Sequence, residues 1–335
     1  MNRFFVLATE FNVLNHVAVL AGADRNALIY LVQDPLAQSR GFGERLQRVL
    51  GQRRYTVNLL TLDDASVASF QACVAQAVQP LQTGTDFVLA IGGRKRDSIV
   101  LLEVVRKQAL AQQRSLTVVT VAERPAGIEL LALDGAQGLH ATIFSLNNLD
   151  AVRTIDLDEI LALNGYERTP TLPGVRCYFG KRLPNLKIPI DQAKAGDALE
   201  LHALRLVHQH LGEAQRAQVA QLWFGVEIRV CGSTTVGPEF DILLVLRDGR
   251  GIHFECKSGY SGGAKGLQAK VFQLRSAMTP HSGLVICRQY PSAVAATRGT
   301  QAMARQYGHL GKFGVFNAQA NGVAQGLEQA FKKAS

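Results

Sequence analysis

The chain has 335 residues, of which 47% are hydrophobic and 19% are charged. This composition excludes a disordered chain, and the length is sufficient for two domains with separate hydrophobic cores. No apolar run reaches the roughly 18–20 residues of a membrane helix, so we expect no membrane partner. The cysteines are odd in number and show no metal-ligand spacing, which predicts a protein of the reducing cytoplasm. They are Cys73, Cys177, Cys231, Cys256 and Cys287.

The net charge of +9 is unevenly distributed along the chain. Residues 1–145 carry a net charge of +2, and residues 146–335 carry a net charge of +7. From Lys257 onward there are 10 lysines and arginines and a single acid, Glu328. A basic surface is typical of proteins that bind nucleic acid, although the same charges also keep a domain in solution. The charge alone leaves both interpretations open.

Apolar strands alternate with amphipathic helices through the first 125 residues. This alternation predicts a mostly parallel, doubly wound sheet in a domain that spans residues 1–145. An Asp at position 63 or 64 is expected to cap the third helix. Residues 128–133 and 139–144 are expected to add an antiparallel pair. The predicted strands are 4–8, 27–32, 56–60, 87–91 and 116–121. The first predicted helix follows the first strand and ends near residue 21, and the other helices cover 36–50, 63–78 and 98–112.

Residues 146–195 are expected to connect this domain to a second one. Prolines interrupt any long element there, and only a short helix near 157–163 is predicted. Residues 196–335 then form the second domain, with a helix, three strands, a helix and a strand in the order of a small mixed-sheet nuclease core. These elements are expected at 196–211, 226–230, 240–246, 252–257, 266–278 and 283–287. The interrupting prolines are Pro170, Pro173, Pro184 and Pro189.

Three ionisable residues lie in the most informative part of the chain. Asp241 begins one apolar strand, and Glu255 and Lys257 end the next. Because residues i and i+2 share a face of a strand, Glu255 and Lys257 point the same way, and Cys256 points into the core. Carboxylates hold Mg²⁺ or Mn²⁺, and an ammonium group offsets charge on a phosphate, so the set suits metal-assisted hydrolysis of a phosphodiester. The alternative, solvated charges on an ordinary hairpin, is disfavoured because the surrounding residues are those of a buried hairpin.

The turn between the two strands decides whether the carboxylates meet. A two-residue Asp-Gly turn would place Asp241 opposite Cys256 and on the other face from Glu255. A three-residue loop of Arg247, Asp248 and a left-handed Gly249 would place Asp241 opposite Glu255 on one face. A shared metal site requires the second arrangement.

Two loops of the first domain follow strands at the edge where open α/β sheets bind ligands. One follows the strand at 4–8. The other follows the strand at 87–91 and carries two glycines and three basic residues before a helix, which favours a phosphate-bearing ligand. The alternative is a tight turn with solvated arginines. The candidate ligand-binding residues are Thr9, Glu10, Asn12, Gly92, Gly93, Arg94, Lys95 and Ser98.

The C-terminal half resembles the PD-(D/E)xK nuclease superfamily. Asp241, Glu255 and Lys257 match the Asp, the Asp/Glu and the Lys of its motif, which implies that all three are catalytic and that the two acids bind the metal. Residues 196–200 resemble the Gly-x-Trp-Leu-Glu helix start of one branch, with Ala198 in place of Trp. This resemblance implies that Glu200 is a further active-site acid.

The N-terminal half resembles a CARF domain, the Rossmann-like sensor of CRISPR ancillary nucleases. Gly92, Gly93, Arg94 and Lys95 match its Gly-Gly-Thr-Lys loop, with Arg94 in place of Thr, and Asn12 matches a polar position after the first strand. The resemblance implies a symmetric homodimer in antiviral defence, with cyclic tetra-adenylate as the allosteric activator. It also implies cleavage of single-stranded RNA or DNA, with nicking of duplex DNA as a further option.

Two other functions remain open on the sequence. One is a restriction or repair-type DNA endonuclease whose N-terminal domain serves only assembly. The other is a nucleotide-binding regulator with an inactive nuclease domain. The joint presence of Asp241, Glu255 and Lys257 counts against the regulator.

Overall fold

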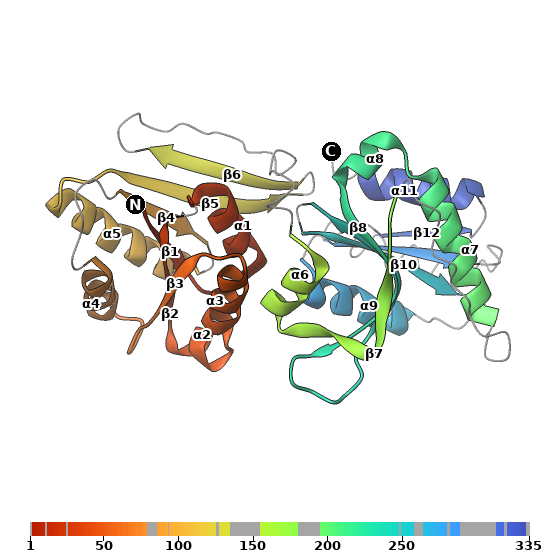
Figure 1. The fold of residues 1–335 in the computed structure, drawn as a ribbon, viewed down its shortest axis with the longest axis horizontal. Coiled ribbons are helices and arrows are strands. Elements are labelled where there is room, and N and C mark those ends of the chain that lie inside the picture. Colours follow the sequence, from red (N-terminus) through yellow and green to blue (C-terminus); the bar gives the residue numbers. More distant parts are fainter. Residues whose placement is uncertain are drawn as a thin grey trace. The chain divides into compact units, whose positions relative to one another are not determined.

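The computed structural model divides the chain into two compact units (Figure 1). Residues 1–124, 128–153 and 162–164 make up the first unit, and the remainder makes up the second. No helix in the described part of the chain is long and apolar enough to cross a membrane. The structure describes residues 2–10, 12–24, 26–78, 86–92, 94–124, 127–134, 155–179, 195–247, 249–257, 264–279, 282–288, 313–317 and 320–332.

The first unit contains a six-stranded sheet in the order β3-β2-β1-β4-β5-β6. The first five strands in this order pair in parallel, which confirms the doubly wound sheet predicted from the sequence. β6 lies beside β5 at the end of the sheet. Residues 139–144 lie outside the described residues, so their expected pairing with 128–133 stays a prediction. The strands are β1 (Arg3–Leu7), β2 (Leu28–Gln33), β3 (Thr56–Thr61), β4 (Phe87–Ile91), β5 (Leu116–Arg124) and β6 (Gly127–Asp134).

Helices cover both faces of this sheet (Figure 1). Buried side chains of α4 and α5 pack on Phe5, Tyr30 and Phe87 on one face, and α1 and α3 contact strands from the other face. The single helix expected over 36–50 is two helices, because Gly41 has a left-handed φ of 63°. The helix expected from residue 63 begins at residue 67. The helices are α1 (Asn12–Gly22), α2 (Pro35–Ser39), α3 (Phe42–Gln52), α4 (Val67–Val78) and α5 (Lys95–Ala111).

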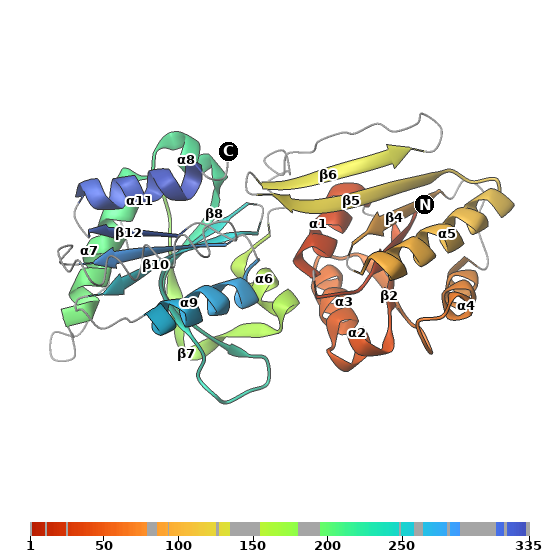
Figure 2. The same ribbon diagram turned by 180° about the vertical axis from the view of Figure 1, so that it is seen from behind.

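The second unit contains a mixed sheet in the order β12-β11-β10-β9-β8-β7. The expected sequence of helix, three strands, helix and strand is present as α7, β8, β9, β10, α9 and β11. One face of the sheet packs on α7 and α11, and α9 contacts the other face (Figure 2). Its elements are α6 (Leu157–Asn164, whose last three residues group with the first unit), β7 (Tyr166–Cys177), α7 (Ala195–His210), α8 (Glu213–Gln218), β8 (Val219–Val230), β9 (Glu239–Leu246), β10 (Gly251–Lys257), α9 (Ala264–Ala277), β11 (Gly283–Arg288), β12 (Phe313–Asn317) and α11 (Ala320–Lys332).

Part of the segment expected to connect the domains is a strand of the second sheet. The short helix predicted near 157–163 is present as α6, but β7 pairs antiparallel with β8 at the end of the sheet. Its prolines, Pro170 and Pro173, had indicated an interrupted chain. They are accommodated because β7 is an edge strand and its register shifts between Arg168 and Pro173.

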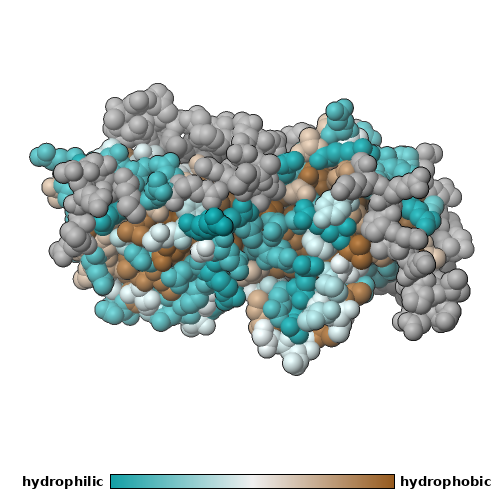
Figure 3. Space-filling view, viewed as in Figure 1, coloured by the Kyte–Doolittle hydropathy of each residue, from teal (hydrophilic) through white to brown (hydrophobic). Residues whose placement is uncertain are grey.

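Apolar side chains concentrate inside the two units. On the face shown in Figure 3, hydrophilic residues form most of the described surface, and hydrophobic residues appear between them in smaller patches. The largest fully buried side chains belong to strands and to the helices that cover them, and include Phe4, Phe70, Phe87, Phe240 and Phe254. Burial of this apolar surface stabilises each unit around its own core.

The hairpin of β9 and β10 has the register that the metal site requires. Gly251 pairs with Val245, and each later pair keeps this register up to Phe254 and Ile242. The next residues along the two strands are Glu255 and Asp241. The loop runs from residue 247 to residue 249, because the backbone of Leu246 bonds to Arg250 and Gly249 has a φ of 84°. Of the two arrangements that the sequence left open, the structure has the three-residue loop that a shared metal site requires.

Replacing Gly249 by Ala should destabilise the second unit, because a left-handed backbone costs a residue with a Cβ roughly 1–2 kcal/mol. The single tryptophan, Trp223, lies in β8, so its fluorescence during guanidinium unfolding reports on this unit. Gly212→Ala is the matched control, because Gly212 has a φ of −66°. Gly212 is also the N-cap of α8, where Gly is preferred to Ala, so we expect that control to cost about 0.5 kcal/mol, less than the change at residue 249. Equal effects of the two substitutions would contradict a requirement for a left-handed residue at 249.

Candidate active site

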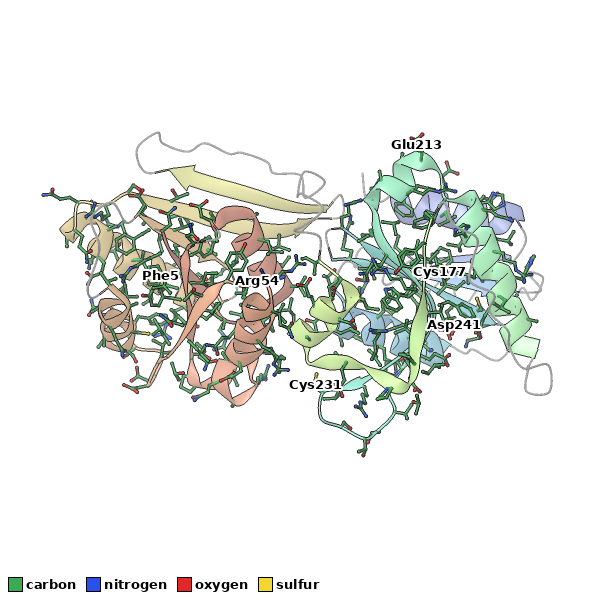
Figure 4. The ribbon with its side chains drawn as sticks, in the orientation of Figure 1. Phe5, Arg54, Cys177, Glu213, Cys231 and Asp241 are labelled. Carbon is green, nitrogen blue, oxygen red and sulfur yellow. The ribbon has the colours of Figure 1, made fainter. Side chains whose placement is uncertain are left out.

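Two buried carboxylates meet at one end of the β9–β10 hairpin. Asp241 is 6% exposed and Glu255 is fully buried. Figure 4 shows Asp241 among the strands of the second unit. Its Oδ2 accepts a hydrogen bond of 2.6 Å from the backbone N–H of Cys256. This bond holds the Asp241 carboxylate against β10, so its position follows from the register of the hairpin.

Two lysines from different elements approach Glu255. Lys257 Nζ, on the same face of β10, lies 2.5 Å from Glu255 Oε1. Lys270 Nζ, on α9, lies 3.1 Å from Glu255 Oε2 and donates to the backbone oxygen of Glu239 at 3.0 Å. Both lysine side chains are partly exposed, whereas the carboxylate is not. The two ammonium groups therefore compensate a charge that water does not reach.

His253 is a member of the site that the sequence analysis missed. It is fully buried and lies on the same face of β10 as Glu255, with its Nε2 3.4 Å from Glu255 Oε2. Its Nε2 accepts a hydrogen bond of 3.2 Å from the backbone N–H of Asp241. The alternation of His253, Glu255 and Lys257 along one strand is the signal that would have found it.

The electrostatics of the two carboxyl groups differ. Burial, and then the charge of Glu255, raise the pKa of Asp241 to about 7. Burial would also raise the pKa of Glu255, but the positive charges of Lys270 and Lys257 outweigh burial and hold that pKa below its ordinary value. Burial lowers the pKa of His253 to about 3, so this ring is neutral at neutral pH and the lysines carry the compensation. At neutral pH Glu255 is ionised, and Asp241 titrates.

These residues fit a divalent cation. One ligand atom from each of Asp241, His253 and Glu255 lies within 4.8 Å of the others. Both oxygens of Glu255 are buried, and their contacts with the Lys257 and Lys270 ammonium groups are ion pairs without hydrogen-bond geometry. Carboxylate oxygens are the ligands that Mg²⁺ and Mn²⁺ prefer, and imidazole suits Mn²⁺ better than Mg²⁺. Asp241 and Glu255 are therefore the fitting ligands. The neutral His253 ring is not a further ligand in this structure, because its Nε2 accepts the Asp241 N–H and its Nδ1 then carries the ring proton.

The two remaining residues of the sequence prediction face the opposite side of the sheet. Cys256 packs in the core under α7 with Cys287, and this contact together with burial raises the pKa of its thiol well above the ordinary value. Glu200, on α7, is half-buried and acts electrostatically on Cys256. It is not part of the group formed by Asp241, His253 and Glu255. The structure thus brings together Asp241, Glu255 and Lys257 and leaves Glu200 outside this cluster.

The first unit has a pocket at the carboxyl ends of β1 and β4. These strands are neighbours at the point where the strand order reverses, which is where open α/β sheets bind ligands. Three residues of the predicted ligand site, Thr9, Glu10 and Arg94, line it. The full lining is Leu7, Ala8, Thr9, Glu10, Asp34, Ala37, Phe42, Arg94 and Asp97.

The other predicted ligand residues do not line this pocket. Asn12 is buried and donates from Nδ2 to the backbone oxygen of Phe42 at 2.9 Å. Ser98 is buried and donates from Oγ to the backbone oxygen of Gly92 at 2.9 Å. These two side chains therefore brace the loops around the pocket. Lys95 is exposed at the start of α5, and residue 93 lies outside the described residues.

The pocket is more acidic than the sequence indicated. Arg94 Nη1 lies 2.8 Å from Asp34 Oδ2, and Asp34 also caps α2 by accepting from Ala37 N–H at 2.6 Å. Asp97 is 4% exposed and adds another carboxylate beside Glu10. The sequence analysis missed Asp34, although it follows β2 at the same edge of the sheet. In this structure the charge of Arg94 is thus already matched.

The sequence matches no protein-family model and no curated protein. Solved structures do resemble the chain. Protein VC1899 from Vibrio cholerae matches with a TM-score of 0.70 and 13% identity, over 100% of this chain and 99% of that one. Can2 from Sulfobacillus thermosulfidooxidans, solved in complex with cyclic tetra-adenylate, matches with a TM-score of 0.66 and 13% identity over 100% of both chains.

The chain has the fold of these proteins over its full length. A type III CRISPR defence DNA nuclease activated by cyclic oligoadenylate also matches, with a TM-score of 0.59 and 17% identity. That match covers 86% of this chain and 45% of the other. The expected fold, an N-terminal doubly wound Rossmann-like domain followed by a C-terminal domain with a mixed sheet, is confirmed.

The raised pKa of Asp241 predicts a pH-dependent cost to stability. Between the unfolded value of 3.8 and the folded value of about 7, the folded state binds more protons, so stability falls as pH rises through this window. Asp241→Asn removes this dependence but keeps an oxygen for the Cys256 N–H. In EDTA at pH 8 the variant should be more stable than the parent protein by about 1 kcal/mol or more.

This difference should disappear below about pH 4, where unfolded and folded Asp241 are both protonated. Urea unfolding followed by Trp223 fluorescence measures it. The exposed Glu213 supplies the matched control, because Glu213→Gln also removes one carboxylate from the second unit. A difference between the Asp241 variant and the parent protein that stays constant with pH would contradict the assignment.

Proposed function

We propose that the protein is a metal-dependent nuclease that cleaves single-stranded RNA or DNA and is switched on by a cyclic oligoadenylate. The observation that carries the nuclease half is the meeting of two buried carboxylates and an ammonium group on one face of the β9–β10 hairpin. The match to Can2 over the full length supports the sensing half, because Can2 was solved with cyclic tetra-adenylate.

The residues of the site have distinct roles in this proposal. Asp241 and Glu255 hold Mg²⁺ or Mn²⁺ through carboxylate oxygens. The bound ion supplies an activated water and charge stabilisation at the phosphodiester. Lys257 lies next to Glu255 and is placed to stabilise charge that develops on the phosphate oxygens. His253 holds the backbone of Asp241, which keeps the two carboxylates together.

The proposed activator is cyclic tetra-adenylate, bound at the pocket of the first unit in a symmetric homodimer. Support comes from the position of the pocket at the switch point of the sheet and from the basic residues Arg94 and Lys95 at the start of α5. The biological setting we propose is CRISPR-linked antiviral defence. Activation then requires the activator to bind one arrangement of the dimer better than another.

One observation favours a second candidate function. The pocket contains the carboxylates of Glu10, Asp34 and Asp97, and Asp34 already pairs with Arg94. Such a pocket is a poor match for an anion, which favours a restriction or repair-type nuclease whose first unit does not sense a nucleotide. Cleavage of RNA and DNA in Mn²⁺, resolved on gels with and without cyclic tetra-adenylate, separates the two functions. Activator-independent cleavage of DNA would support the second.

Asp241→Ala and Glu255→Ala should each abolish cleavage, with a loss of at least about 100-fold, because each removes a carboxylate from the cation. Binding of cyclic tetra-adenylate, measured by calorimetry, should be unchanged, because neither residue belongs to the first unit. Glu213→Ala removes an exposed carboxylate of α8 and is the matched control. Cleavage at the parent rate in both site variants would refute the site assignment.

Arg94→Ala and Lys95→Ala should weaken binding of cyclic tetra-adenylate, because both side chains lie at the start of α5 beside the pocket. Each lost charge-assisted contact costs roughly 1.5–3 kcal/mol, or about 10- to 100-fold in affinity. Arg106→Ala is the matched control, because Arg106 is an exposed arginine of α5 that pairs with Glu103 and does not line the pocket. Unaltered affinity in the double variant would show that the activator binds elsewhere.

A further inference from the structure

Lys270 brings a second ammonium group to the site from outside the hairpin. Its Nζ lies 3.1 Å from Glu255 Oε2 and bonds to the backbone oxygen of Glu239 at 3.0 Å. Glu239 begins β9, two residues before Asp241, so Lys270 links α9 to both strands that carry the carboxylates. Its side chain is 25% exposed, and the ammonium group therefore lies between solvent and the buried Glu255.

The two oxygens of Glu255 are divided between the two lysines. Lys257 holds Oε1, and Lys270 holds Oε2. Oε2 is also the oxygen beside His253, whose Nε2 accepts the N–H of Asp241. The Lys270 ammonium thus pairs with the Glu255 oxygen on the His253 side, beside the group of Asp241, His253 and Glu255 atoms that could hold a cation. A divalent cation and an ammonium group repel each other at such a distance, so the two compete for this oxygen.

We infer that Lys270 is a positioning residue of this site. Its ammonium group pairs with Glu255 Oε2 until a divalent cation takes that oxygen. The ammonium group then binds a phosphate oxygen of the nucleic acid. The inference rests on the proposed nuclease function. A lysine displaced from a carboxylate keeps its charge and its three donors, and the phosphodiester is the anion that the substrate brings to the same place. Lys257 and Lys270 then flank the phosphate from a strand and from a helix.

A lysine that only clamps α9 to the sheet would act differently. Its removal would loosen the contact with Glu239 and lower the stability of the fold, and it would leave the affinity for nucleic acid unchanged. A lysine that competes with the cation and then binds phosphate shifts two affinities in opposite directions. Its removal strengthens binding of the metal and weakens binding of the nucleic acid.

The test uses the full chain with Lys270→Ala and Lys270→Arg, and with Lys107→Ala as the matched control. Lys107 is an exposed lysine of α5 that also pairs with a glutamate. Calorimetry measures Mn²⁺ binding to the metal-free proteins, and fluorescence anisotropy measures binding of a labelled single-stranded oligonucleotide in Ca²⁺. Thermal unfolding of each variant reports on folding.

For Lys270→Ala we expect Mn²⁺ to bind about 3- to 10-fold more tightly and the oligonucleotide about 10-fold more weakly. Lys270→Arg keeps the charge, so it should retain oligonucleotide binding, and Lys107→Ala should match the parent protein in both assays. An Mn²⁺ affinity of Lys270→Ala at or below the parent value, or an unchanged oligonucleotide affinity, would overturn the inference.

Glu255→Gln separates this inference from the nuclease function on which it rests. That variant should lose Mn²⁺ binding and cleavage if the metal site is correct. If it does, and Lys270→Ala still behaves like Lys107→Ala, only the role of Lys270 fails. If Glu255→Gln keeps both properties, the proposed function fails and the inference fails with it.

Discussion

The backbone hydrogen bond between Leu246 and Arg250 sets the register of the β9–β10 hairpin, and the chemistry of the second unit depends on that register. A strand alternates its side chains between two faces, so a shift of one residue would turn Asp241 away from Glu255. The bond from the Cys256 N–H to Asp241 then holds the two strands together at the site itself. The same local pairing thus stabilises the sheet and assembles the cluster.

The cluster holds two carboxyl groups, Asp241 and Glu255, in a buried position where ionising both costs free energy. Two ionised carboxylates that are shielded from water repel each other. In this structure two lysines pair with Glu255, and the pKa of Asp241 is raised. Such an arrangement is costly without a counter-ion and becomes favourable with one. Release of this repulsion would contribute to binding in the proposed cation site.

The sequence was sufficient to predict those features that depend on residues close together along the chain. Strand alternation placed Glu255 and Lys257 on one face, and alternation of strands and helices predicted the doubly wound sheet. The face of Asp241 depended on the loop length, which the sequence left open. His253 was available from the same two-residue spacing and was overlooked. Lys270 was not available, because the rotation of α9 over the sheet depends on tertiary packing. The acids Asp34 and Asp97 of the pocket were also not predicted, because the segments that carry them follow separate strands and meet only in the folded sheet.

The prolines of β7 were misread because they weaken a strand in the middle of a sheet but are tolerated at its edge. Their position has a consequence for how the protein meets other chains. An edge strand with regular N–H and C=O groups invites a further strand to add to the sheet, and such addition leads to uncontrolled association. Pro170 and Pro173 remove two donors, and the register shift before Pro173 bends the strand. Strand addition at β7 is therefore hindered, and any specific assembly of this unit has to use its side chains and not its backbone at that edge.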